Sequence, residues 1–93
     1  MSNHVRRSAD PRLPLWLRVV WAGLERAAAG PGIEPVIVPW LPGELRATVD
    51  RSGLTAPKDI SRAIATAKRY GLLDPGSCAR VLVMPADYAR RQT

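Results

Sequence analysis

Residues 54–73, LTAPKDISRAIATAKRYGLL, separate into an apolar face and a polar face when they are read as a helix from Pro57. The apolar positions follow the spacing i, i+3, i+4 and i+7, which is one continuous stripe on a helix: Ile60, Ala63, Ile64 and Ala67. The opposite stripe holds cations, a hydroxyl and a small side chain: Lys58, Ser61, Arg62, Ala65 and Arg69. A helix of this kind must bury one side, so the rest of the chain has to supply a core against it.

The polar stripe has the chemistry that a DNA groove requires. Cations can meet phosphates, hydrogen-bonding groups can reach base edges, and Ala65 would allow close approach. Asp59 and Thr66 lie near the edge of the stripe. A solvated helix surface can show the same pattern, so that simpler interpretation stays open.

The length, the hydrophobic fraction and the net charge of the chain fit one small domain with a polyanionic partner. A chain of 93 residues has no room for two independent cores, and a hydrophobic fraction of 46% is enough for one. The formal net charge of +6 favours nucleic acid as a partner.

Several function classes are disfavoured. One cysteine, Cys78, and one histidine, His4, cannot form a disulfide framework or a four-ligand zinc site. There are no paired carboxylates beside a nucleophile and no Gly-rich phosphate loop after a strand. We therefore expect no enzyme activity, no cofactor or metal and no small-molecule ligand. The absence of a long apolar run or signal-peptide core predicts a cytoplasmic protein that does not enter a membrane.

Residues 1–12 are polar and contain several arginines, which predicts a flexible basic arm, either solvated or in contact with phosphates or the minor groove. Residues 13–85 form the predicted domain, and residues 86–93 a basic tail.

The first helix is predicted over 13–29. Its apolar surface exceeds half its circumference, because Trp16 and Val19 lie off the main stripe. Either other elements wrap this helix, or these two residues pack on a second copy of the chain as a homodimer.

The remaining pattern predicts a mainly α fold with a small antiparallel β wing, in the order helix, strand, helix, helix, strand, strand. Residues 36–38 are β-branched between prolines, which limits them to a short edge strand. A helix over 44–49 and a turn at 50–53 come next, after which Leu54 is expected to return to the core. A turn at 74–77 would join strands 72–74 and 79–84 as a hairpin.

Three segments carry a resemblance to a known family. ISRAIATAKRYGLLDPGS resembles the recognition helix and wing of small winged helix-turn-helix DNA-binding proteins. LPGEL upstream and ARVLVMP downstream are similar to small proteins of this kind in actinobacteria and their phages. The resemblance spans residues 40–85 and implies sequence-specific binding of double-stranded DNA by a transcriptional regulator, in the bacterial cell or a phage-infected host.

The resemblance also implies roles for particular residues. The helix over 57–70 would lie in the major groove, and the wing over 74–80 would reach the backbone or the minor groove. The residues implied in base contact are Ser61, Arg62, Lys58 and Thr66. Those implied in backbone contact are Arg69, Arg80, Arg46, Thr55 and Ser52. Two alternatives remain: a protein-interaction module on the same fold, or an accessory DNA-binding factor in replication or excision.

Overall fold

The computed structural model describes residues 7–28 and 36–85, and its ordered elements follow one another along the chain. They are the 3-10 turn η1 (Arg7–Ala9), α1 (Leu15–Ala28), β1 (Val36–Pro39), α2 (Glu44–Val49), α3 (Pro57–Arg69) and β2 (Val81–Met84). Over these residues the fold is a small α+β arrangement of three α-helices and a two-stranded antiparallel sheet. The α+β class predicted from the sequence is confirmed at that level.

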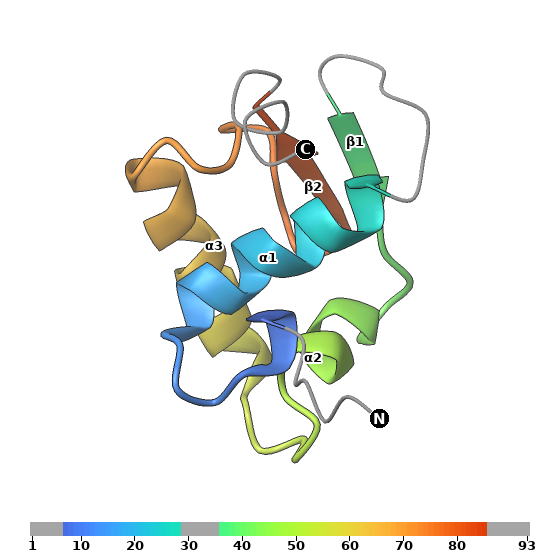
Figure 1. Cartoon of the computed structure of the whole chain (residues 1–93), viewed down its shortest axis with the longest axis vertical. Helices are drawn as coiled ribbons and strands as arrows, with labels where there is room; N and C mark the ends of the chain where they lie inside the picture. The colour runs from blue at the N-terminus through green and yellow to red at the C-terminus, as the bar shows by residue number, and fades with distance from the viewer. Residues whose placement is uncertain (1–6, 29–35, 86–93) are drawn as a thin grey trace, which may run out of the picture.

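Helix α1 is the central element, and every other element packs on it (Figure 1). Pro14 precedes the helix, and its carbonyl accepts bonds from the N–H groups of Leu17 and Arg18 at 3.0 and 3.1 Å. A proline suits this position because its missing N–H would have no partner inside the helix. Val19 and Val20 in the middle of α1 are fully buried.

The broad apolar surface of α1 is covered by other elements of the same chain. Val19 is 0% exposed, so the expectation that it faces a second copy is wrong. Trp16 is half-buried, and its ring lies 4.9 Å from that of Tyr70, which follows α3. The alternative in which other elements wrap the first helix therefore describes the structure at Val19.

The sheet joins β1 to β2 in antiparallel register, with Val36 opposite Met84 and Val38 opposite Leu82. The short strand predicted over residues 36–38 is confirmed, and its partner is the last strand. Alternate side chains of β2 point to the same face, and Leu82 and Met84 are buried there against the core.

The predicted hairpin forms only in part, because residues 72–74 are not a strand. A single backbone bond links them to β2, from the Asp74 N–H to the Val83 carbonyl at 2.8 Å. The Asp74 carboxylate then accepts the N–H of Gly76 at 2.9 Å, so the chain turns away at once. The Ser77 hydroxyl continues the pairing, since it accepts the Val83 N–H at 2.9 Å and donates to the Val83 carbonyl. The first strand of the predicted wing, over residues 72–74, is thus replaced by a turn and one buried serine.

Helices α2 and α3 begin where the sequence predicted them. Leu45 and Val49 of α2 are buried, as are all four residues of the α3 apolar stripe. Leu54 does not return to the core, because its side chain is 88% exposed. The turn that carries it closes on its own hydrogen bonds, with Gly53 in a left-handed conformation at φ 73°.

The folded unit includes part of the expected N-terminal arm. η1 packs on α1 and α2, and the buried Ser8 donates its hydroxyl proton to Glu25 Oε1 at 2.7 Å. The guanidinium of Arg7 lies 4.5 Å from the centre of the Trp21 ring. Residues 7–12 of the predicted arm therefore belong to the packed structure, whereas its residues 1–6 and the tail over 86–93 lie outside the described residues.

Close packing at Gly23 predicts a sensitive core position. A Cβ at residue 23 would lie 2.6 Å from Met84 Sδ and 3.3 Å from Leu82 Cδ1, both in buried side chains. Overpacking costs about 1–3 kcal/mol, and a 2.6 Å contact with a buried side chain belongs to the upper part of that range. Alanine gains roughly 1 kcal/mol over glycine in a helix, which offsets part of this cost. Gly23→Ala should therefore lower the free energy of unfolding by about 1–2 kcal/mol in urea denaturation. Adding Met84→Val should restore part of the loss, and an unchanged urea midpoint in the single variant would contradict this packing.

Candidate nucleic-acid interface

The rotation of α3 about its axis is fixed by its buried side. Ile60, Ala63, Ile64 and Ala67 are at most 6% exposed and belong to the core, to which α1 makes the main contribution. With that side fixed, the residues predicted on the opposite stripe are all exposed: Lys58, Ser61, Arg62, Ala65 and Arg69. The two-faced helix inferred from the sequence is confirmed residue by residue.

The cations of this stripe are only weakly engaged. Arg62 has a side chain 78% exposed, and its Nη1 lies 4.0 Å from Asp59 Oδ1. An exposed pair at this distance is screened by water and contributes little. Within residues 7–28 and 36–85, Lys58 and Arg69 form no ion pair. The basic groups can therefore meet an incoming anion without first breaking a strong contact.

Thr66 is less available than the other predicted base contacts. It is half-buried, and its hydroxyl donates to the Arg62 carbonyl one turn earlier at 3.0 Å. This back-bonding to the helix is common for threonine. Thr66 could accept a hydrogen bond from DNA but would have to break this contact to donate one.

The turn between α2 and α3 is organised by Asp50. Its carboxylate accepts the N–H of Ser52 at 3.0 Å, the N–H of Thr55 at 2.8 Å and the hydroxyl protons of both residues. These bonds, above all those from the Ser52 and Thr55 hydroxyls, hold the pKa of Asp50 well below its usual range. Ser52 and Thr55 were predicted to contact the DNA backbone. In the folded chain their hydroxyl protons are directed to Asp50, so donation to a phosphate would require one of these bonds to break.

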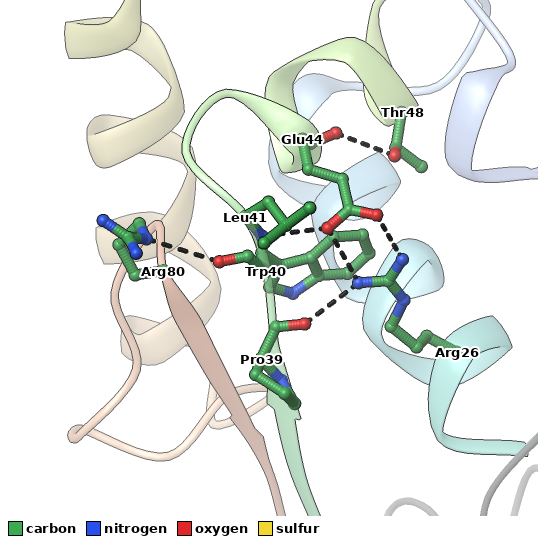
Figure 2. A network of polar contacts seen from close by, with 7 residues as sticks. All are labelled: Arg26, Pro39, Trp40, Leu41, Glu44, Thr48 and Arg80. Carbon is green, nitrogen blue, oxygen red and sulfur yellow. Dashed lines mark hydrogen bonds and ion pairs between the residues drawn. The ribbon is translucent and has the colours of Figure 1, made fainter.

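The two remaining predicted contacts come from other elements. Arg46 is half-buried on α2, and Arg80 is exposed just before β2. Arg80 Nε donates to the Trp40 carbonyl at 3.3 Å, which ties it to the end of β1 (Figure 2). The structure thus places Lys58, Ser61, Arg62 and Arg69 on one face of α3. Arg46 and Arg80 lie on other elements.

A network around Arg26 holds the start of α2 in place (Figure 2). The guanidinium lies 4.0 Å from the centre of the buried Trp40 ring, donates to the Pro39 carbonyl at 2.9 Å and forms an ion pair with Glu44. Glu44 also accepts the N–H of Leu41 at 2.9 Å. One arginine of α1 therefore joins the end of β1 to the first turn of α2.

Sequence reasoning missed two features of this region. Arg51 is exposed in the turn that leads into α3, and it could have been found by asking which cations flank the start of the polar stripe. The pairing of Arg26 with Glu44 joins residues 18 positions apart, and no local pattern reports it.

No protein-family model, curated protein or solved structure matches the chain. Among the described residues, no three His, Cys, Asp or Glu side chains gather in a way that could hold a metal ion. Over the same ranges, none of the helices has the length and apolar character needed to cross a membrane.

The Arg26 network predicts a pH dependence of stability. The ion pair with Arg26 and the Leu41 N–H lower the pKa of Glu44 from 4.5 to about 2. The folded pKa is depressed, so the stabilisation by Glu44 is complete above pH 4.5 and is lost as the pH falls towards 2. Thermal unfolding of the wild type and Glu44→Gln should differ most at neutral pH, and the difference should shrink over this interval.

Arg26→Gln is the matched variant for this test. It removes the largest cause of the lowered pKa, so the acid-dependent part of the stability contributed by Glu44 should move to higher pH. A constant difference between wild type and Glu44→Gln from neutral pH to pH 2 would contradict the pairing.

Proposed function

We propose that this chain binds double-stranded DNA through the exposed stripe of α3 and acts as a sequence-specific, non-enzymatic transcriptional regulator. The observation that carries the proposal is a rigidly seated helix whose outward face holds cations and a hydroxyl around the small Ala65. The net charge of +6 favours the same partner.

The chemistry assigns two kinds of contact to this face. Arg62 is the residue suited to a bidentate contact with guanine, and Ser61 can donate to or accept from a base edge beside it. Lys58, which the resemblance grouped with the base contacts, lies in the first turn of α3 and, like Arg69, is suited to a phosphate. The small side chain of Ala65, between them, leaves room for the helix to approach the bases.

The other elements play a smaller part in the proposal. Because one strand of the expected wing is replaced by a turn, backbone contact on that side rests on Arg80. Arg46 and Arg51 are further candidates for phosphate contact, from α2 and from the turn before α3. Ser52 and Thr55 act by holding that turn through Asp50.

Salt dependence tests the proposal directly. Each phosphate contact releases counterions, so the logarithm of the association constant should fall linearly with the logarithm of the salt concentration. The measurement is fluorescence anisotropy with labelled duplexes, and with duplexes selected from a random pool for sequence preference. Absence of salt-dependent binding to any duplex would refute DNA binding and favour the protein-interaction module.

Substitutions on α3 should separate base contacts from phosphate contacts. Arg62→Ala should weaken binding to the selected duplex by about 1–3 kcal/mol and relax the preference at one base pair. Lys58→Ala or Arg69→Ala should weaken binding to all duplexes alike and reduce the salt slope by about 1 each.

Arg12→Gln is a suitable charge control. It removes a cation whose side chain is 86% exposed on a different segment, and glutamine can still hydrogen-bond to Asp10. This variant should keep the base preference and most of the affinity. If it weakened binding as much as Lys58→Ala did, the effect would be one of net charge or of contact by the N-terminal arm, and not of a site confined to α3.

A further inference from the structure

Leu54, in the turn before α3, is the most exposed large apolar residue among those that the structure describes, at 88%. A single exposed leucine is common on protein surfaces and needs no function. What distinguishes Leu54 is the hydrogen bonding of its backbone and its position four residues before Lys58, the first residue of the basic stripe. Its significance as a contact rests on the DNA binding proposed above.

The backbone around Leu54 is fixed by local hydrogen bonds. Four consecutive N–H groups are satisfied inside the turn: those of Ser52 and Thr55 by the Asp50 carboxylate, that of Gly53 by the Asp50 carbonyl, and that of Leu54 by the Ser52 hydroxyl. A side chain on such a turn loses little further backbone freedom when it meets a ligand. Leu54 is therefore presented to solvent on a preorganised support.

The position of the turn brings Leu54 to the N-terminal end of α3. The segment between α2 and α3 extends past the start of that helix in Figure 1. Leu54 and Lys58 are four residues apart, so their Cα atoms are separated by at most about 14 Å. Arg51 and Lys58, both exposed, stand on either side of it in the chain. Asp50 is the carboxylate within the turn, and its oxygens accept the bonds just described.

We infer that Leu54 contacts the C5-methyl group of a pyrimidine at the edge of the DNA site. This methyl group is the main apolar feature of the major groove, and apolar side chains recognise it there. The flanking cations favour DNA over an apolar protein surface as the occupant. Leu54 would then add a preference for a methylated pyrimidine next to the bases that α3 reads.

The test uses the duplex recovered from the random pool, with each thymine replaced in turn by deoxyuridine. The replacement removes one methyl group and leaves base pairing intact. For the wild type, one position should lose about fourfold in affinity, as expected for one methyl group withdrawn from apolar contact. Leu54→Ala should bind the thymine and deoxyuridine duplexes equally at that position.

Leu41→Ala is the matched control, because Leu41 is also an exposed leucine, at 70%, in a turn before a helix. It should keep the full thymine preference of the wild type. A second arm places cytosine or 5-methylcytosine, each paired with guanine, at the same position. If methylation of the cytosine raises the affinity of the wild type but not that of Leu54→Ala, the methyl group is recognised in either base. If only thymine is preferred, the contact is restricted to that base.

The outcomes separate this inference from the function on which it rests. If the wild type binds duplexes in a salt-dependent way but tolerates deoxyuridine at every position, the Leu54 contact is refuted and DNA binding stands. The Leu54 contact would also be refuted if the wild type and Leu54→Ala preferred thymine over deoxyuridine to the same extent. If no duplex is bound, both proposals fail together.

Discussion

The packing of the α3 apolar stripe against α1 is the interaction on which the rest of the structure depends. Val19 and Val20 of α1 and the apolar residues of α3 share one core, and the removal of such side chains from water provides the main stabilisation in a chain of this size. This packing also sets the rotation of α3. The side chains of Arg62 and Lys58 are exposed because Ile60 and Ile64, on the opposite side of the helix, are buried. The stability of the fold and the candidate interface therefore have a common cause.

Polar groups then fix the segments that the core cannot reach. Arg26 holds the end of β1 and the start of α2 through Trp40 and Glu44, and Asp50 closes the turn between α2 and α3. The guanidinium of Arg26 and the carboxylate of Asp50 each contact several partners at once. Because the direction of α3 is set by its core contacts and by this turn, Asp50 connects local loop chemistry to the presentation of the proposed DNA-binding face.

Among the described residues, the sheet has two strands and lacks the additional strand that a complete hairpin would supply. Ser77 supplies both a donor and an acceptor to Val83, so the edge of β2 is satisfied without a further strand. A short, turn-covered edge also limits pairing with other chains. As a result, the region expected to form an extended wing is compact, and the proposed DNA contacts are concentrated on α3 and the turn that precedes it.

The sequence by itself determined the helices, the short strand at β1 and the two faces of α3, because each depends on spacing along the chain and on local signals such as Pro57. It also predicted which α3 residues would be exposed. Only the tertiary structure decided that Val19 is covered within the chain, that Leu54 stays in solvent, and that Ser52 and Thr55 bond to Asp50. These outcomes depend on which distant elements meet and on where each hydroxyl finds its nearest acceptor. Local spacing carries no information on which distant elements meet, which is also why the pairing of Arg26 with Glu44 became visible only in the folded chain. The bonds from Ser52 and Thr55 to Asp50 are local, but they depend on the conformation that the turn adopts.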